Sequence, residues 1–349
     1  MSLQTQYINF IKNIKLTRES DKYKEAREKD DLITPKVESA FKDEGYVVDS
    51  NFLQGSLATH TGIIPLDGDY DIDRAVVITK SSSPTDPIEP KKIVKDVLSN
   101  HGFKNPRIKK PCVTANYESK PLHIDFPIYR IDEYGNYQLA VGKENANEEN
   151  KYWDDSDPKE LVDWITSDTH HQSIFEKLSD EEVWQYYRLV RYIKRWRDFQ
   201  YKSETERKKV YSISLTVMFK ESFKPNVDDS GKPDDHSALK DTLDTMLNIK
   251  NYFIGTAEGK FKIIVNLPVK PKRDIFNDKG NDVGTTLKNR LQKLLDTLHT
   301  VDSKQDLKEQ CELLQKQFGY DFPVPDNSNK NNSRTTSKTA GLVGVSNGA

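Results

Sequence analysis

The sequence predicts an α+β fold in which a mixed sheet with helices precedes a helical C-terminal lobe. Runs typical of strands fall before about residue 150, and helical periodicity dominates after it. The 349 residues suffice for two domains or one large bilobal domain. The expected divisions are N-terminal helices that pack across both lobes (1–44), a core (45–150), a helical lobe (151–325) and a polar, disordered tail (326–349).

Composition excludes several classes of protein. Lys and Arg total 53 and Asp and Glu 55, so the chain is not generally basic and no stable nucleic-acid partner is expected. Cys112 and Cys311 lie far apart, which suits a reducing cytosol and predicts neither a disulfide scaffold nor a cysteine zinc site. The N-terminus lacks the apolar core of a signal peptide, and no run approaches the roughly 20 apolar residues of a membrane span. A cytoplasmic protein without a membrane partner is predicted.

The first 150 residues alternate between helical and extended patterns. Residues 3–44 read as helix, and Pro35 is expected to restart it. A strand is expected near 47–53 and an amphipathic helix from residue 91 to Gly102. Two strands at 111–118 and 121–130, joined by a short turn, predict a hairpin.

The second half reads as helix. Asp157 is a candidate N-cap with Pro158 in the first turn. The clearest helix covers 180–200, and of its basic residues we expect one to reach nucleotide phosphates and most to lie on the surface. These basic residues are Arg188, Arg191, Lys194, Arg195 and Arg197. Further helices are expected at 209–222, 236–249, 283–299 and 303–317, with a short extended segment within 261–276.

Residues 53–78 hold the strongest chemical pattern. A small-residue turn, Gly55-Ser56, is followed by Asp67, Asp69, Asp71 and Asp73, which share one face of an extended segment. Like charges on one face repel, so they need a compensating cation or strong solvation. An apolar strand, 75–78, follows at once. The turn could hold a triphosphate and the carboxylates the metals that bridge triphosphate and acceptor, which indicates a magnesium-dependent phosphoryl transferase.

Asp125 is a candidate third ligand. It alternates with Ile124 and Phe126, so it faces away from them, and a buried unpaired carboxylate there would be costly. Taken alone, an edge strand with Asp125 in water explains the pattern at least as well. Together with the upstream carboxylates, a metal ligand is the better interpretation.

Other motifs fail on their spacing. An EF-hand loop starting at Asp67 would have Ile72 at position six and Ile78 at position twelve, where Gly and Glu are required. Neither a P-loop nor a GxGxxG fingerprint is present. His170 and His171 are adjacent and lack the spacing of a zinc site.

The ordered motifs QGSLATHTGIIPLDGDYDID, HIDFPIYR, YYRLVRYIKRWRD and YSISLTV resemble the bacterial CD-NTases. These belong to the DNA polymerase β-like nucleotidyltransferases and are relatives of cyclic GMP-AMP synthase and oligoadenylate synthase. The resemblance covers most of 45–325. It implies a nucleotidyltransferase lobe, an oligoadenylate-synthase-like helical lobe and an active site in the cleft between them.

The resemblance also implies roles for particular residues. Asp71 and Asp73 would bind two Mg²⁺ ions, for which Mn²⁺ could substitute, and Asp125 would bind the ion that activates the acceptor hydroxyl. The implied nucleotide-binding residues are Gln54, Gly55, Ser56, Lys194 and Ser212.

Two features of the phosphate-loop region leave alternatives open. His60 precedes Thr61 where the family commonly has glycine, so the phosphate loop could be shaped differently. Asp69-Tyr70-Asp71 also fits the acid–hydrophobic–acid pattern. Asp71-Ile72-Asp73 is preferred because it abuts the strand and matches the family's usual DID.

The implied activity is the joining of NTPs, ATP and/or GTP, with release of pyrophosphate. The product would be a cyclic oligonucleotide of two or three nucleotides, or a linear one, that signals in anti-phage defence (CBASS) and is read by a separate effector protein. A ubiquitin-transfer-like enzyme could join the tail to other molecules; the alternative is an ordinary disordered end. Two other functions remain: transfer of nucleotide to tRNA or protein, and nucleotide binding without catalysis.

Overall fold

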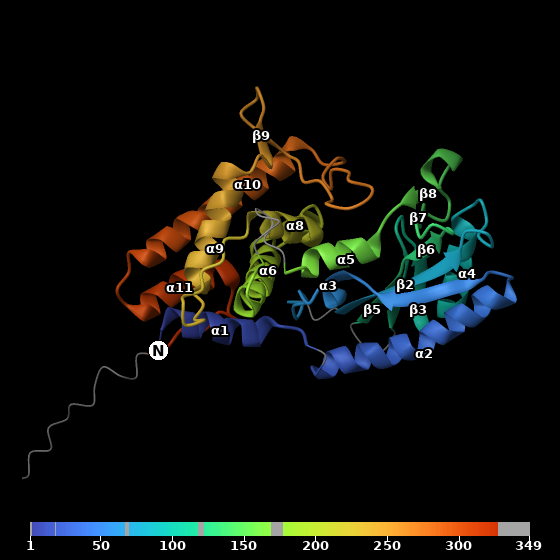
Figure 1. Ribbon diagram of the computed structural model, residues 1–349, viewed down its shortest axis with the longest axis horizontal. Coiled ribbons are helices and arrows are strands. Elements are labelled where there is room, and N and C mark those ends of the chain that lie inside the picture. The colour runs from blue at the N-terminus through green and yellow to red at the C-terminus, as the bar shows by residue number, and fades with distance from the viewer. Residues whose placement is uncertain (1, 18, 67–69, 118–121, 169–176, 327–349) are drawn as a thin grey trace, which may run out of the picture.

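The computed structural model describes residues 2–17, 19–66, 70–117, 122–168 and 177–326. It confirms the α+β fold class: a lobe built on a mixed sheet lies beside a helical lobe, with α3 and α5 near their junction (Figure 1). The strands are β1 Val48–Leu53, β2 Tyr70–Thr79, β3 Phe103–Ile108, β4 Val113–Tyr117, β5 Leu122–Phe126, β6 Ile128–Ile131, β7 Tyr137–Val141, β8 Tyr152–Asp155, β9 Phe253–Gly255 and β10 Phe261–Ile263. The α-helices are α1 Leu3–Ile14, α2 Asp21–Asp43, α3 Gly55–Ala58, α4 Ile88–Asn100, α5 Pro158–Thr166, α6 Asp180–Gln200, α7 Glu204–Arg207, α8 Ser212–Ser222, α9 Asp235–Asp244, α10 Asn281–Asp302 and α11 Leu307–Phe318.

Strand β2 is the centre of the large sheet. It pairs with β1 in antiparallel and with β5 and β6 in parallel orientation. Asp73 lies opposite Asp125 and Val76 opposite Ile128, so β5 and β6 follow β2 in one register, interrupted only at Pro127. The predicted hairpin is present as β4 and β5. Strands β3, β7 and β8 were not predicted, and β8 continues the sheet to residue 155.

The two faces of β2 have different roles. Ile72, Val76 and Ile78 belong to a buried cluster shared with α2 and α4. The opposite face holds a smaller cluster that includes Ala75 and Val77. Because side chains alternate along a strand, Asp71 and Asp73 also lie on this second face, at the end of the strand that the smaller cluster leaves uncovered.

The N-terminal helices differ from the prediction at one point. In place of one continuous helix, α1 ends at Ile14 and α2 begins at Asp21, whereas α2 runs through Pro35 without restarting. Pro35 removes one helical hydrogen bond, and the buried side chains of Ile33 and Val37 on either side compensate by packing in the core. The N-terminal start of α4 also differs: it begins at Ile88, three residues earlier than expected.

Helix α6 is the core of the helical lobe. A capping box formed by Ser179 and Glu182 starts it, and every residue from 185 to 196 is buried. Within this core Asp235 is fully buried and accepts bonds from Arg188 Nε (2.7 Å), Arg188 Nη2 (2.8 Å) and Tyr192 Oη (2.9 Å). The expectation that most basic residues of this helix lie on the surface is therefore wrong. Of the five, Arg188, Arg191, Lys194 and Arg195 are buried.

No helix in the described parts of the chain is both long and apolar enough to cross a membrane.

Substituting Asp235 by Ala should strongly destabilise the helical lobe, because Arg188 would keep a buried charge without its carboxylate. We expect a loss of about 3–5 kcal/mol in the free energy of unfolding, measured by urea denaturation followed by circular dichroism. Glu181→Ala is the matched control: it removes the other carboxylate of Arg188, which is 35% exposed, and should cost at most about 1 kcal/mol. Equal losses in the two variants would contradict this account.

Candidate active site

A cavity of about 1040 Å³ lies between the two lobes. The sheet side contributes two of the three predicted carboxylates, Asp71 and Asp125, and the helical side contributes Lys194 and Ser212. Ser56 also lines it. The structure thus brings five of the predicted site residues around one space.

The three carboxylates lie on one face of neighbouring strands. Asp73 and Asp125 are register partners on β2 and β5, and Asp71 is two residues before Asp73. Burial raises the pKa of Asp73 to about 7, and the carboxylates of Asp125 and Asp71 add to that shift. This local excess of negative charge favours a cation.

The carboxylate of Asp125 lacks, among the described residues, a hydrogen bond that a buried oxygen normally makes. Its Oδ1 is buried and accepts no hydrogen bond from any described residue. The ammonium nitrogen Nζ of Lys109 lies 4.0 Å from that oxygen. Ile124 and Phe126 are buried in the core, which confirms that Asp125 faces away from them.

These residues fit a magnesium site by donor type. Carboxylate oxygens are the ligands that Mg²⁺ prefers, and it is commonly held by one or two of them together with substrate phosphates. As they stand, no three Asp, Glu, His or Cys side chains within the described ranges surround a common point in the manner of a complete metal site. The carboxylates therefore suit an ion whose remaining ligands come from water and substrate.

The Gly-Ser turn is in direct contact with Asp73. Gly55 has a φ of +69°, and a Cβ built on it would lie 2.2 Å from Asp73 Oδ2. Gln54 donates its backbone N–H to the carbonyl of Asp73 at 3.0 Å. The side chain of Gln54 instead accepts a bond from Tyr129 Oη at 3.1 Å and is not among the residues that line the cavity.

On the helical side, Lys194 is buried beneath the segment that follows the turn. Its Nζ donates to Thr61 Oγ1 at 2.7 Å and to the Thr61 carbonyl at 3.2 Å. Burial lowers the pKa of Lys194 to about 7, and the nearby Arg197 and Arg191 guanidinium groups contribute. Ser212 stands in the first turn of α8, where its Oγ accepts a bond from Arg197 Nη1 at 2.5 Å.

Other basic residues of α6 bind the same segment through its carbonyls. Arg191 Nε donates to Gly62 O at 3.2 Å, and Arg195 Nη2 donates to Ile64 O at 2.5 Å. His60 adopts a φ of +55°, a left-handed conformation in which glycine is favoured. A glycine would adopt this conformation without the strain that the Cβ of a histidine brings.

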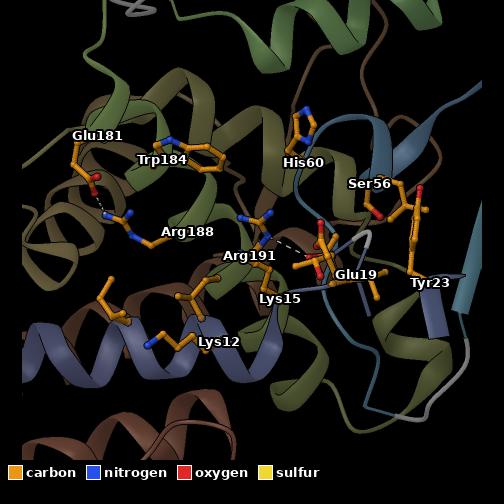
Figure 2. A pocket seen from close by; sticks show the side chains of 16 residues that line it. Lys12, Lys15, Glu19, Tyr23, Ser56, His60, Glu181, Trp184, Arg188 and Arg191 are labelled. Carbon is orange, nitrogen blue, oxygen red and sulfur yellow. Dashed lines mark hydrogen bonds and ion pairs between the residues drawn. The ribbon is translucent and has the colours of Figure 1, made fainter. Parts of the chain in front are cut away.

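A second cavity, of about 540 Å³, lies on the other side of this segment, against α1 and α6 (Figure 2). Ser56 and Leu16 line both cavities. In Figure 2, Lys12, Lys15, Arg188 and Arg191 lie around the second cavity with the carboxylates Glu19 and Glu181. The segment from Ser56 to Gly62 therefore separates the two cavities, and basic side chains line the second one.

Several cleft residues were not identified from the sequence. The sheet side adds Arg107, Lys109 and Lys143, and the helical side adds Tyr211. Arg197, one of the five basic residues expected in the helix at 180–200, also lines the cleft. The sequence carries no sign of Lys143, which follows β7. Lys109 could have been noticed, because it lies two residues before the predicted strand at 111–118, which pairs with the strand of Asp125.

Some predicted features lie outside the described residues. These are Asp67, Asp69, His170, His171 and the tail beyond residue 326. The alternative pair Asp69–Asp71 therefore stays open.

Comparisons with known proteins agree with the resemblance seen in the sequence. Residues 50–129 match the family model described as "Cyclic GMP-AMP synthase DncV-like, nucleotidyltransferase domain". The chain is 31% identical over 194 residues to a curated cyclic GMP-AMP synthase of Escherichia albertii. That match spans 53% of this chain and only 40% of the relative.

Solved structures give the same fold over most of the chain. CdnG of Bradyrhizobium diazoefficiens, solved with GTP, has a TM-score of 0.67 at 16% identity, covering 91% of this chain and 95% of that one. CdnC of E. coli MS115-1, solved with ATP, has a TM-score of 0.63 at 16% identity, covering 91% and 98%. DncV of Vibrio cholerae has a TM-score of 0.59 at 18% identity, covering 93% and 81%. Together the comparisons confirm the resemblance to CD-NTases, and the solved structures establish the fold.

Substituting Gly55 by Ala should destabilise the protein more than the same change at Gly45. Both glycines have positive φ, but a Cβ at Gly45 meets nothing within 4 Å, whereas at Gly55 it would overlap the Asp73 carboxylate. The strain common to both positions is about 1–2 kcal/mol, and the overlap should add about 1–3 kcal/mol at Gly55. Urea denaturation measures both. In an Asp73→Ala background the extra loss at Gly55 should disappear; its persistence would show that the overlap is not its cause.

The buried position of Lys194 predicts a pH-dependent contribution to stability. Its pKa is about 7 when folded and about 10.4 in an unfolded chain, so between these values the unfolded state holds more protons. Wild type should therefore gain stability relative to Lys194→Met as the pH rises from about 7 to about 10. Urea denaturation at several pH values tests this. Lys177→Met, at a side chain that is 79% exposed, is the control and should keep a constant offset from wild type. A constant offset for Lys194→Met as well would refute the prediction.

Proposed function

We propose that the protein is a metal-dependent nucleotidyltransferase that joins NTPs, with release of pyrophosphate, into a cyclic oligonucleotide of two or three nucleotides. The observation that carries this proposal is the register pair Asp73–Asp125, which lies with Asp71 on one face of the sheet. Of these three carboxylates, Asp71 and Asp125 line the inter-lobe cleft. The similarity of residues 50–129 to the DncV-like nucleotidyltransferase domain supports the same reaction class.

Asp71, Asp73 and Asp125 would hold the divalent ions, two Mg²⁺ with Mn²⁺ as a possible substitute. Bound there, the ions would lower the pKa of the acceptor hydroxyl and neutralise charge on the donor phosphates and the leaving pyrophosphate. The acceptor oxygen forms a bond to the donor α-phosphorus as the bond to pyrophosphate breaks, and the hydroxyl proton leaves to solvent.

The remaining predicted residues would bind and orient the donor. The backbone N–H groups and hydroxyl of Gly55-Ser56 would hold its triphosphate beside Asp73. From the helical side, Lys194 and Ser212 would bind the same phosphates. Lys194 is positioned for this role through Thr61, and a phosphate anion close to its Nζ would favour the charged form that burial disfavours. Gln54 would act through the backbone, since its side chain is bonded to Tyr129.

ATP and GTP are the proposed substrates, because structural relatives were solved with GTP and with ATP. A cyclic product requires that the linear intermediate bind again so that its free hydroxyl attacks its own triphosphate. Such a product would act as a second messenger in anti-phage defence, read by a separate effector protein in the cytoplasm. Control of the enzyme through its C-terminal tail by a ubiquitin-transfer-like partner belongs to the same proposal.

The test is product analysis with purified protein. Each labelled NTP, singly and in mixtures, is incubated with Mg²⁺ or Mn²⁺, treated with phosphatase and resolved by chromatography and mass spectrometry. We expect a phosphatase-resistant oligonucleotide that Asp71→Ala/Asp73→Ala reduces at least about 10³-fold, because these carboxylates would hold both ions.

Two outcomes of this experiment would favour the alternative functions. Label transferred to added RNA or protein would replace the cyclic-oligonucleotide proposal by modification of a macromolecule. NTP binding that is independent of metal, with no pyrophosphate released in any mixture or extract, would indicate a non-catalytic binding protein.

The control variant is Asp132→Ala. Asp132 lies at a turn in the same lobe and does not line the cleft, so this variant should keep full activity.

A further inference from the structure

We propose that the buried ion pair between Asp30 and Arg74 positions the carboxylates of β2 for metal binding. This inference rests on the proposed function, because it concerns the same metal site. Neither Asp30 nor Arg74 is among the residues that line the two cavities described above, and the side-chain bonds of the pair run to α2 and β1.

The pair joins α2 to β2 through several bonds. Arg74 Nε donates to Asp30 Oδ1 at 2.9 Å, and Nη2 donates to Asp30 Oδ2. Thr34 Oγ1 and Arg27 Nη1 also donate to Asp30, at 2.9 and 3.0 Å. The third nitrogen of Arg74, Nη1, donates to Asn51 Oδ1 on β1 at 2.9 Å. One guanidinium therefore ties together a helix and two strands.

Its place along β2 gives this link a consequence for the site. Arg74 directly follows Asp73 and points to the opposite face of the sheet, where α2 packs. The β1–β2 ladder ends at the pair Leu53–Arg74 and is followed by one backbone bond, from the N–H of Gln54 to the carbonyl of Asp73, whereas β5 continues to pair with β2 through Asp71 and Asp73. Arg74 is thus the last residue of β2 in the ladder with β1, and it lies next to the two carboxylates that β2 carries beyond that ladder.

The charges explain why an anchor is needed there. Asp71, Asp73 and Asp125 repel one another, which favours separation of the ends of β2 and β5. A neutral, fully hydrogen-bonded pair on the far face opposes that separation without adding charge to the site. Asp30 is completely buried and Arg74 is 6% exposed, so the geometry of the bonds is fixed by packing on every side.

The helical lobe supplies a matched control. Arg188 and Asp235 form a buried pair with the same pattern of two bonds, Nε and Nη2 to the two carboxylate oxygens. That pair lies in the helical core, away from the carboxylates of the sheet. A purely structural role predicts the same behaviour for both pairs, whereas a positioning role predicts an effect on metal binding from Arg74 alone.

The experiment measures Mn²⁺ binding to the full chain by electron paramagnetic resonance, alongside thermal unfolding. Arg74→Lys keeps the positive charge but loses the bidentate hydrogen bonding to the Asp30 carboxylate. We expect it to remain folded and to bind Mn²⁺ about tenfold more weakly, as for other changes behind a metal's ligands. Arg188→Lys should leave Mn²⁺ affinity unchanged. Equal Mn²⁺ affinity in wild type and Arg74→Lys would overturn the inference.

A second variant guards against loss of folding. Asp30→Leu/Arg74→Met replaces the pair by apolar residues of similar size, which buried ion pairs often tolerate. Weakened Mn²⁺ binding by this folded variant supports the inference, and wild-type binding overturns it. Unfolding of both variants, while Arg188→Lys remains folded, would make the pair structural only.

The Mn²⁺ titration also separates this inference from the proposed function. If Asp71→Ala/Asp73→Ala binds Mn²⁺ as well as wild type does, the proposed metal site is wrong and the inference fails with it. If that variant loses binding while Arg74→Lys does not, only the inference fails.

Discussion

The parallel register that sets Asp73 beside Asp125 is the constraint on which the cleft depends. Neighbouring strands lie about 4.8 Å apart, so the register fixes two like charges close together. Ile72, Ile124 and Phe126 are buried on the opposite face, and a slip of one residue would expose them and bury the carboxylates. The apolar core therefore selects an arrangement that repulsion between the carboxylates opposes. A site held by core packing in this way keeps its unfavourable charge until a cation binds.

The helical lobe, across the cleft from the carboxylates, buries positive charge on α6. Lys194, Arg191 and Arg195 are buried on α6, and each donates to backbone carbonyls of the segment between Thr61 and Ile64. Carbonyl groups satisfy the N–H donors but only partly replace the hydration of a full charge, which is why the pKa values of Lys194 and Arg191 fall to about 7 and about 10. At Lys194 and Arg191 the helical lobe thus holds positive charge through carbonyl and hydroxyl oxygens, whereas Arg195 also pairs with the carboxylate of Asp321 at 3.4 Å.

The fold class and the carboxylates of the sheet could be predicted from local patterns, whereas the roles expected of Lys194 and Ser212 came from the family resemblance. The assembly of these residues around one cleft could not be predicted from local patterns. Alternation along the strand placed Asp125 away from Ile124 and Phe126, and the N-cap at Asp157 and the helix at 180–200 followed from capping and periodicity. The burial of Arg191 and Arg195 escaped prediction because their partners are carbonyls more than a hundred positions away, which leave no trace in side-chain pattern. The predicted restart of the helix at Pro35 is wrong for a related reason. The packing of α2 in the core outweighs the tendency of proline to break a helix. Asp30 and Arg74, 44 positions apart, gave no signal either.

The segment from Gly55 to Ile64 touches both sets of charges. At its start Gly55 lies against the Asp73 carboxylate, and near its end Thr61 holds the ammonium of Lys194. The two walls cannot neutralise each other, because this segment and the cleft lie between them. A ligand that carries both phosphate anions and a divalent cation would satisfy both at once, with the anions toward Lys194 and the cation toward Asp73. Neither a bare anion nor a bare metal ion would do so, which is the physical reason to expect that nucleotide and metal bind this cleft cooperatively.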